Sequence, residues 1–384
     1  MKLYYVAHCR FPSPRAHAIQ IAKMAESFAL TSVDLELILP RRNNSISQSP
    51  REFYGLKTDL PIRYLPVLNL YAWGRIGYVL GGLSFLISYM FFLLRKRMCK
   101  EKFILYTIDM DEFSFIGISF FLVPFIIEIH GSKKYGVLLS RMFKRAQAIL
   151  TINNLIKDDL VQNFRIPEER ILVHPNGIDL DLFSKSESRE AWRLKWNIPI
   201  NSHVALYVGK CYDWKGMEIL HDAFRALPDV TFVFVGCTKE EFERVTKSHV
   251  GMPNAIFFGE RPYIEMPLWM KSADVLLVLG TKKNAYSYTQ TSPMKLFEYM
   301  ASGVPVLSPN TPALRAHVSE REVVFYEPDS SESFIRGIRN VIGNRSVKEL
   351  TVHAREATKQ FSWEHRAKQI LARFPQQYVH ERNS

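Results

Sequence analysis

The sequence lacks the cysteine spacing of a zinc site or of a disulfide framework. Its four cysteines are Cys9, Cys99, Cys211 and Cys237, and no two of them form a CxxC pair. Scattered cysteines of this kind are typical of reduced thiols in a cytosolic protein, so neither a disulfide nor a metal site is expected. No GxGxxG turn follows the first strand-like run or opens the second half, which argues against a nicotinamide-dependent dehydrogenase.

Acidic residues are in the minority, with 38 Asp and Glu against 50 Lys and Arg and a net charge of +12. Such an excess favours anionic membrane surfaces, nucleic acid or phosphorylated substrates. No recognition motif for nucleic acid is present, so that partner is discounted. The chain opens directly on the strand-like run KLYYVA, and no cleavable signal peptide is expected.

Long hydrophobic runs are also few, and the longest covers residues 76–94, which contain no charge and precede Arg95, Lys96 and Arg97. A run of this length could just span a bilayer. A second apolar run covers residues 113–129, and a single crossing between the two would divide the N-terminal sheet. We therefore expect a buried or interfacially dipping helix at 76–94, with a paired, hairpin-like insertion as the alternative.

The 384 residues are long enough for two domains, and both halves alternate strand-like runs with helical patterns. This alternation predicts an α/β fold of two Rossmann-like, doubly wound domains that face a cleft. We expect an N-terminal Rossmann-like domain over 1–183, a C-terminal Rossmann-like domain over 184–360, and a C-terminal helix over 361–384 that packs back across the domains. Predicted strands cover residues 2–7, 34–39, 62–67, 103–107, 124–129, 148–152 and 170–175, then 204–209, 231–236, 255–259, 275–280 and 304–308.

The most informative stretch is SPMKLFEYMASGVPV, residues 292–306. Ser292 and Pro293 suit the N-cap and first position of a helix that covers 294–302, and Gly303 suits its left-handed end. The free N–H groups at such a helix start, with Lys295 beside them, form a site for a phosphate-sized anion. Glu298, one turn further on, is placed to accept hydrogen bonds from sugar hydroxyls. An ordinary capped helix with a solvated Lys and Glu is the alternative.

Two further motifs follow strands. In VGKCYDWKG, residues 208–216, Lys210 and Lys215 flank a glycine turn, and two cations there could neutralise a diphosphate leaving group. In IEIHG, residues 127–131, His130 leaves an apolar strand and could contact a sugar hydroxyl, although a lone histidine is more often structural.

Two loops complete the set of candidates. We interpret HPNGID, residues 174–179, as a hinge turn between domains. In CRFPSPRAHAIQ, residues 9–20, Arg15 and His17 lie at the start of the first predicted helix, where either could meet an acceptor phosphate. Solvated side chains are an equally good account of both.

These motifs, together with SPRAHAIQIAKMAESFA and Phe183 after the HPNGID turn, resemble the family-four glycosyltransferases of GT-B fold. The resemblance covers nearly the whole chain. It implies a retaining, metal-independent transfer of a hexose from a nucleotide sugar in the interdomain cleft, with no bound cofactor. It also implies the roles of individual residues: His130, Lys215 and Gln290 at the reaction centre; Lys210, Lys215, Ser292, Pro293, Met294, Lys295 and Glu298 at the donor; Arg15 and His17 on the acceptor side.

The sequence departs from the family at one position. The family commonly carries two glutamates with seven residues between them, and here Gln290 stands at the first position and Glu298 at the second. A neutral amide can hydrogen-bond a sugar hydroxyl but cannot supply negative charge beside an oxocarbenium ion. A non-catalytic nucleotide-sugar-binding or scaffold protein is therefore the rival interpretation. For the enzyme, we expect a glycan or lipid-linked acceptor in cell-surface polysaccharide or glycoconjugate synthesis, and a cytoplasmic location at the inner face of the membrane.

Overall fold

The computed structural model describes residues 2–109, 116–184, 188–248, 251–344 and 346–374. The chain divides into two units, one formed by Met1–His174 with Trp363–Ser384 and the other by Pro175–Ser362. The boundary at which the chain first passes from one unit to the other lies between His174 and Pro175, inside the HPNGID turn. The ranges expected from the sequence place this boundary after residue 183. We call these parts the N-terminal unit and the C-terminal unit.

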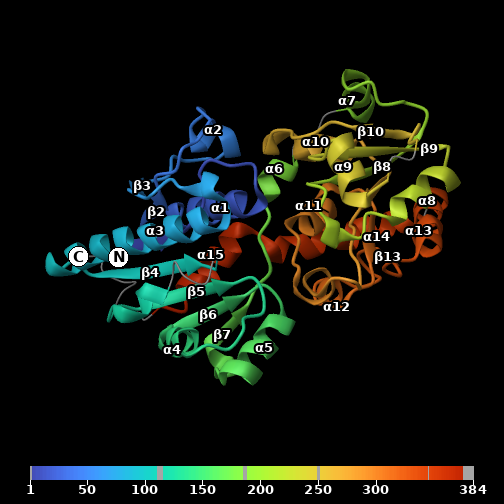
Figure 1. Ribbon diagram of the computed structural model, residues 1–384. Helices are drawn as coiled ribbons and strands as arrows, with labels where there is room; N and C mark the ends of the chain where they lie inside the picture. The colour runs from blue at the N-terminus through green and yellow to red at the C-terminus, as the bar shows by residue number, and fades with distance from the viewer. Residues whose placement is uncertain (1, 110–115, 185–187, 249–250, 345, 375–384) are drawn as a thin grey trace. The chain divides into compact units, whose positions relative to one another are not determined.

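The N-terminal unit is built on a seven-stranded sheet in the order β3-β2-β1-β4-β5-β6-β7 (Figure 1). All neighbouring strands in it are parallel. The strands are β1 (Lys2–Val6), β2 (Asp34–Pro40), β3 (Ile62–Leu65), β4 (Phe103–Ile108), β5 (Phe125–Ile129), β6 (Ala148–Thr151) and β7 (Ile171–Val173). Each predicted strand of this half is confirmed, because a parallel sheet covered on both faces needs continuous apolar runs that the sequence shows directly.

The helices of this unit are α1 (Ala16–Ala29), α2 (Pro50–Tyr54), α3 (Gly74–Met98), α4 (Val137–Arg145), α5 (Asn154–Phe164) and α15 (Trp363–Leu371), with 3-10 turns η1 (Tyr71–Trp73), η2 (Ile116–Phe120) and η3 (Glu168–Arg170). Helix α15 comes from the far end of the sequence and packs against α1 (Figure 1). The N-terminal sheet is therefore covered partly by residues that follow the whole C-terminal unit.

Helix α3 coincides with the apolar run, and it presents two different faces. Phe85, Tyr89 and Leu93 are fully buried in the core of the unit. On its other face, Ile76, Ile87 and Phe91 are each 69% exposed. Residues 71–98 are long and apolar enough to cross a membrane by length and composition, and one third of the most apolar stretch is buried. Part of the second apolar run, residues 113–115, lies outside the described residues.

The C-terminal unit contains a six-stranded parallel sheet in the order β10-β9-β8-β11-β12-β13. Its strands are β8 (His203–Val208), β9 (Val230–Val235), β10 (Ala255–Phe257), β11 (Val275–Leu277), β12 (Val306–Pro309) and β13 (Val324–Tyr326). Five of them match the predicted runs. The sequence analysis missed β13, because it is a short edge strand that lies between charged residues and has no extended apolar run.

Helices and turns complete the C-terminal unit: α6 (Leu180–Ser184), α7 (Arg189–Lys195), η4 (Asp213–Lys215), α8 (Ile219–Ala226), α9 (Lys239–Thr246), η5 (Tyr263–Glu265), α10 (Met266–Lys271), the π-helix η6 (Tyr286–Gln290), α11 (Met294–Ser302), α12 (Pro312–Arg315), α13 (Ser331–Gly343), α14 (Val347–Thr358) and η7 (Lys359–Phe361). Its apolar core forms between the sheet and helices that include α8 and α13. Both units therefore have the predicted doubly wound α/β architecture, which places functional loops at the carboxyl ends of the strands.

Candidate functional site

Helix α11 begins at Met294 and ends at Ser302, as predicted, and Gly303 follows in the left-handed conformation with a φ of 78°. The predicted N-cap was wrong by one residue: Pro293, not Ser292, occupies the cap position, and no side chain caps the helix. Proline cannot accept a hydrogen bond through its side chain, and the buried Ser292 hydroxyl has no partner. The start of α11 therefore keeps backbone N–H groups that no side chain satisfies, which is the arrangement that binds anions.

Two lysines, Lys215 and Lys295, lie together beside this helix start, and we call them the lysine pair. The Nζ atom of Lys295 lies 3.9 Å from the centre of the Tyr207 ring. The Nζ atom of Lys215 donates to the Tyr207 hydroxyl over 2.9 Å and to the Lys210 carbonyl over 3.1 Å. A Cβ atom on Gly209 would lie 2.9 Å from the Lys295 Nζ and 3.9 Å from the Lys215 Nζ. The missing side chain of this glycine thus makes room for both ammonium groups.

Burial disfavours the protonated, charged form of both lysines in the pair. It lowers the pKa of Lys215 to about 8. Burial, followed by the charge of Lys215, lowers the pKa of Lys295 well below its usual value. Lys210, in contrast, is partly exposed and forms an ion pair with Glu260. The structure therefore brings two of the three predicted donor-site lysines together, and an anion bound there would stabilise the protonated form of both.

Glu298 is buried on α11, and the hydroxyl of Tyr263 donates to its Oε1 over 2.9 Å. Burial raises the pKa of Glu298 to about 7, although the Tyr263 hydrogen bond and the charge of Lys295 oppose that rise. The carboxyl group can therefore be present in either form near neutral pH. Sequence reasoning missed Tyr263, because the preceding Pro262 signalled only the start of a helix.

Gln290 ends the π-helix η6, which lies directly before the loop that leads into α11. The ring of Tyr286 in η6 meets the ring of Trp214 in η4 edge to face, with 5.2 Å between centroids. Because η4 also contains Lys215, this aromatic contact joins the turn that carries the lysine to the helix that carries Gln290.

The HPNGID turn has a contact that the sequence analysis did not foresee. The side-chain amide of Asn176 donates to the carbonyl of Ser292 over 2.8 Å, and both residues are buried. Asn176 therefore supports the loop before α11. A turn motif alone could not reveal this, because the two residues are 116 positions apart.

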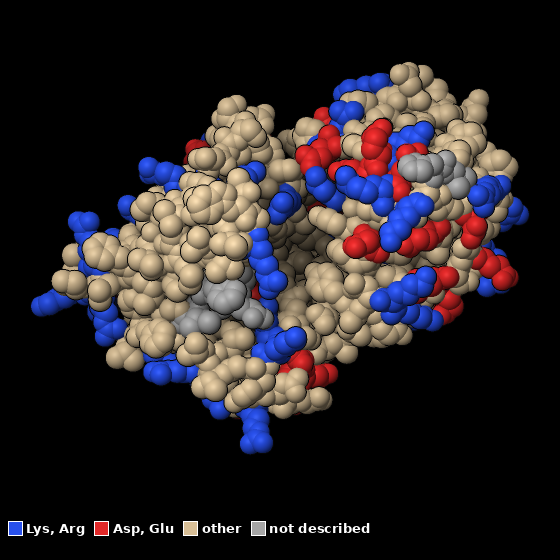
Figure 2. Space-filling model, in the orientation of Figure 1, with Lys and Arg blue, Asp and Glu red and all other residues tan. Residues whose placement is uncertain are grey.

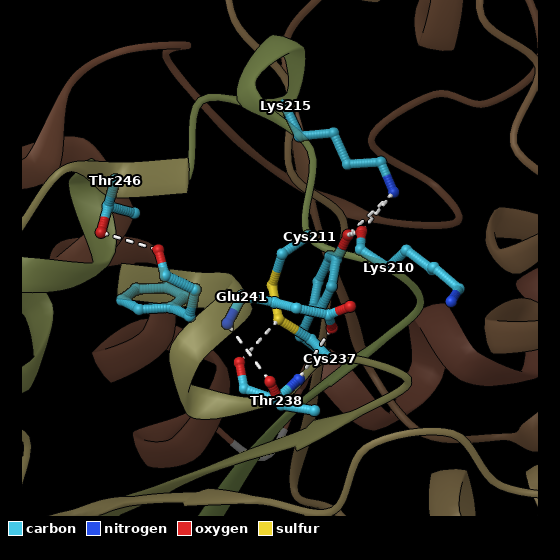
Figure 3. The surroundings of a disulfide bond; sticks show 9 residues. Lys210, Cys211, Lys215, Cys237, Thr238, Glu241 and Thr246 are labelled. Carbon is cyan, nitrogen blue, oxygen red and sulfur yellow. Dashed lines mark hydrogen bonds between the residues drawn. A yellow bond between two sulfur atoms is a disulfide. The ribbon is translucent and has the colours of Figure 1, made fainter. Parts of the chain in front are cut away.

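The expectation of four reduced cysteines was wrong, because Cys211 and Cys237 form a disulfide bond. Cys211 follows Lys210 after β8, and Cys237 follows the end of β9, so the bond links the loops after two neighbouring strands (Figure 3). Cys9 and Cys99 are free. No local pattern indicates this pairing, because the two cysteines are 26 positions apart and meet only through the parallel sheet.

In the N-terminal unit, His130 belongs to a buried cluster that we call the Glu128 network, formed by Gln20, Tyr106, Glu128, His130 and Arg366. Arg366 donates to both oxygens of Glu128, over 2.6 Å and 3.1 Å. Gln20 donates to Oε1 of the same carboxylate over 2.7 Å, and the Nε2 atom of His130 lies 2.5 Å from it. Tyr106 donates to Oε2.

Burial alone would raise the pKa of Glu128, but the charges of Arg366 and His130 outweigh it and hold the pKa well below its usual value. Glu128 and Arg366 have no exposed side-chain surface. The carboxylate is therefore ionised and saturated with donors, and it fixes one nitrogen of the His130 ring.

Arg15 and His17 lie at the start of α1, with Arg15 in the N-cap position and no side-chain cap. Burial, together with the charges of Arg15, His130 and Arg42, lowers the pKa of His17 to about 4. His17 therefore lies within electrostatic reach of both Arg15 and His130. They lie in the N-terminal unit, whereas the lysine pair, Glu298 and Gln290 lie in the C-terminal unit.

Among the described residues, no group of three or more His, Cys, Asp and Glu side chains could hold a metal ion. The polar groups of the C-terminal unit instead suit a diphosphate at the lysine pair and the α11 start, with a hydroxyl donor near Glu298.

Each of the two units contains a parallel α/β sheet whose functional loops follow the strands. The chain therefore has the GT-B fold of nucleotide-sugar glycosyltransferases. The solved structure of Anabaena Alr3699/HepE in complex with UDP-glucose shares that fold, with a TM-score of 0.73, 14% identity, and coverage of 97% of this chain and 100% of that one. Residues 188–361 match the family model described as "Glycosyl transferases group 1". The chain belongs to this family, the GT4 glycosyltransferases.

Curated relatives are distant. TuaH of Bacillus subtilis, provisionally assigned as a teichuronic acid biosynthesis glycosyltransferase, is 22% identical over 234 residues, which cover 60% of this chain and 57% of that relative. The lipopolysaccharide 1,2-N-acetylglucosaminetransferase of Salmonella typhimurium is 22% identical over 285 residues, which cover 66% of this chain and 72% of that relative. The chain thus spans little more than half the length of curated relatives such as TuaH.

Proposed function

We propose that this glycosyltransferase is a retaining, metal-independent hexosyltransferase. It moves a sugar from a UDP-activated donor to a glycan or lipid-linked acceptor in cell-surface polysaccharide or glycoconjugate synthesis. The observation that carries the proposal is the lysine pair beside the uncapped start of α11, because two partly buried lysines that share at most the charge of Glu298 favour a diphosphate. The UDP-glucose in the similar Anabaena structure supports the choice of donor.

In this mechanism the bond between the sugar C1 and the β-phosphate oxygen breaks, and UDP leaves with the electron pair. The lysine pair and the α11 N–H groups stabilise the charge that develops on the phosphate. The acceptor hydroxyl forms the new C1–O bond on the same face and passes its proton to the departing phosphate oxygen. Glu298 holds the ribose, Lys210 contributes to the diphosphate site, and His130 and Gln290 contact the sugar.

We further propose that the enzyme works in the cytoplasm at the inner face of the membrane. The exposed face of α3 supports this location, because Ile76, Ile87, Phe91 and Met98 recur at helical spacing and are each 69% or more exposed. Arg95 and Arg97 near the end of the same helix could meet anionic headgroups. In this arrangement the helix lies in the interface and does not cross the bilayer.

Calorimetric titration with UDP, GDP and ADP, each with and without glucose attached, tests the donor site. We expect UDP to bind the wild type and Lys295→Met to weaken its affinity by about a hundredfold, since a buried charge contact to phosphate is lost. Lys239→Met is the matched control, because Lys239 is an exposed lysine of the same unit on α9. Equal UDP affinity in wild type and Lys295→Met would refute the site.

The rival proposal, a nucleotide-sugar-binding scaffold, is favoured by one observation, the neutral Gln290 in place of a glutamate. It predicts UDP-glucose binding without either transfer or donor hydrolysis. Release of glucose or UDP from UDP-glucose by the wild type, absent in Lys295→Met, would exclude it.

A further inference from the structure

Arg42, just after β2, is a half-buried arginine that has no carboxylate partner among the residues that the structure describes. Its guanidinium lies over the Tyr71 ring, 4.0 Å from the centroid, and one terminal nitrogen lies 2.6 Å from Nε2 of His8. Its Nε is buried and has no hydrogen-bond partner. Burial lowers the pKa of Arg42, because the charged form is partly desolvated.

Two fully buried arginines, Arg193 and Arg366, have carboxylate partners. Arg366 pairs with Glu128, and Arg193 pairs with Asp274 over 2.8 Å. Burying a guanidinium without a counter-ion is costly, so proteins rarely do so without a reason. Arg42 thus has the environment of a group whose counter-ion arrives with a ligand.

The loops around Arg42 form one continuous surface at the carboxyl edge of the N-terminal sheet. His8 follows β1, and Arg42 follows β2, a direct neighbour of β1 in the sheet. The side-chain amide of Asn44 donates to the carbonyl of Pro12 over 2.8 Å, which joins the two loops. This edge of a parallel sheet is where ligands of doubly wound folds bind.

Further positive charge gathers at the same edge. Arg15 occupies the N-cap of α1, and the first turn of this helix contains no acidic residue. His17 lies in the same turn and, with a pKa of about 4, adds a neutral imidazole and not a charge. Cations at the positive end of a helix are unfavourable unless an anion is present. The pKa of His17 responds to the charges of both Arg15 and Arg42, so these groups lie close to one another. On the face shown in Figure 2, the N-terminal unit displays far fewer acidic than basic side chains.

We propose that His8, Arg15, His17 and Arg42, the basic pocket, bind a phosphate group of the acceptor substrate. Phosphate fits better than carboxylate, because it offers three acceptor oxygens and up to two negative charges to several donors. The Nε and a terminal nitrogen of Arg42 can hold two of those oxygens side by side. The assignment rests on the proposed function, because it names the substrate class that the donor sugar would reach.

The phosphate could belong to a soluble phosphorylated acceptor or to a lipid headgroup. Tyr71, which packs on Arg42, lies in η1 immediately before α3, the helix with the exposed apolar face. The segment that packs on Arg42 therefore directly precedes the helix proposed to contact the membrane. The experiment has to distinguish a phosphate on a soluble acceptor from a phosphate on a lipid headgroup.

The test uses the full chain saturated with UDP, so that the donor site is occupied, and titrates glycerol 3-phosphate by calorimetry. We expect binding to the wild type and a loss of about tenfold or more in Arg42→Gln, the effect of one charge-assisted contact. Arg41→Gln is the control, because it removes the same charge from the exposed neighbouring residue. It should change the affinity by less than about twofold. Arg42→Lys, which keeps the charge but loses the planar fork, should fall between wild type and Arg42→Gln.

A second arm measures flotation with phosphatidylcholine vesicles that contain or lack phosphatidic acid. If vesicle binding depends on both Arg42 and phosphatidic acid, and glycerol 3-phosphate does not bind, the phosphate belongs to a lipid headgroup. If glycerol 3-phosphate binds in an Arg42-dependent way and phosphatidic acid adds no vesicle binding, the phosphate belongs to a soluble acceptor. Equal behaviour of wild type and Arg42→Gln in both arms overturns the proposal. Unchanged UDP affinity and melting temperature in Arg42→Gln show that the variant is folded. If UDP itself does not bind, the proposed function fails. Titration of glycerol 3-phosphate without UDP then still tests whether the basic pocket binds phosphate.

Discussion

The lysine pair of the C-terminal unit and the Glu128 network of the N-terminal unit are both charged clusters near the carboxyl edge of a parallel sheet. Glu128 is surrounded by an arginine, a tyrosine, an amide and a histidine, and these partners keep it ionised in spite of complete burial. Lys215 and Lys295 contact a phenol ring, a carbonyl and each other, and burial lowers both pKa values. Glu128 has its own counter-ion in the same cluster, whereas the charge of Glu298 offsets the lysine pair only in part, and an anionic ligand would complete the neutralisation.

The comparison therefore distinguishes charged groups that stabilise the folded protein from charged groups that are placed to bind a ligand. A saturated carboxylate stabilises the unit in which it lies and holds His130 in one orientation. A pair of ammonium groups that is not fully neutralised lowers the free energy of unfolding of the ligand-free protein. An anion that binds there raises it again. Arg42 resembles the lysine pair in this respect, although it lies in the same unit as Glu128.

The largest effect is expected when the counter-ion of Glu128 is removed. Arg366→Met leaves a buried carboxylate without its main partner and should destabilise the N-terminal unit by about 3–5 kcal/mol. Hydrogen exchange of β5 and α15 amides at increasing urea measures this change separately from the C-terminal unit.

Two controls sharpen that result. Combining Arg366→Met with Glu128→Gln should recover part of the loss, since no buried charge remains. Glu332→Gln breaks the exposed pair with Arg336 and should leave the exchange pattern unchanged. If Arg366→Met exchanged like the wild type, the Glu128 network would not be a stabilising element of the fold.

A smaller effect is expected from proton uptake at the lysine pair. Because the pKa of Lys215 is about 8 and that of Lys295 is well below its usual value, a bound diphosphate should raise both and draw protons from the buffer at pH 8. Glu298, with a pKa of about 7, is already mostly ionised at that pH and contributes little. Uptake should decrease at pH 6, where Lys215 is protonated before UDP arrives.

The measurement is the apparent enthalpy of UDP binding in buffers that differ in ionisation enthalpy. A slope that corresponds to about one proton taken up by the wild type, and to less in Lys215→Met, is the expected outcome. A binding enthalpy that is the same in every buffer would show that the pair is fully charged before binding, and the contrast with Glu128 would then disappear.

The smallest effect is expected at Gln290, the neutral residue that ends η6. Gln290→Ala should lower turnover by about tenfold and leave UDP affinity within about twofold, since it removes one neutral hydrogen bond to the sugar. Steady-state transfer or hydrolysis of UDP-glucose, together with calorimetry, separates the two quantities. Equal turnover would remove Gln290 from the mechanism, and Gln290→Glu tests whether a charge at this position speeds the reaction.

The sequence allowed prediction of the strands and of α11 because buried parallel strands are continuous apolar runs and helix ends have local signals. The seven N-terminal strands and the bounds of α11 were found in this way. The failures are contacts between distant residues. Glu128 and Arg366 are 238 positions apart, and only the return of α15 to the N-terminal unit brings them together.

The same reason explains the missed disulfide and the missed support of α11 by Asn176. Cys211 and Cys237 meet because β8 and β9 are neighbours, a fact of sheet order and not of local pattern. Local motifs were enough to propose the three lysines as candidates, but the sequence could not show that Lys215 and Lys295 share one glycine-lined space whereas Lys210 pairs with Glu260.

The return of α15 also sets the order in which the chain can be completed during synthesis. The N-terminal unit leaves the ribosome first, yet the guanidinium that neutralises Glu128 is made only after the whole C-terminal unit. Until residue 366 has been made, Glu128 lacks its arginine partner and α1 lacks its contact with α15. The unit that is translated first is therefore complete only after the unit that is translated second.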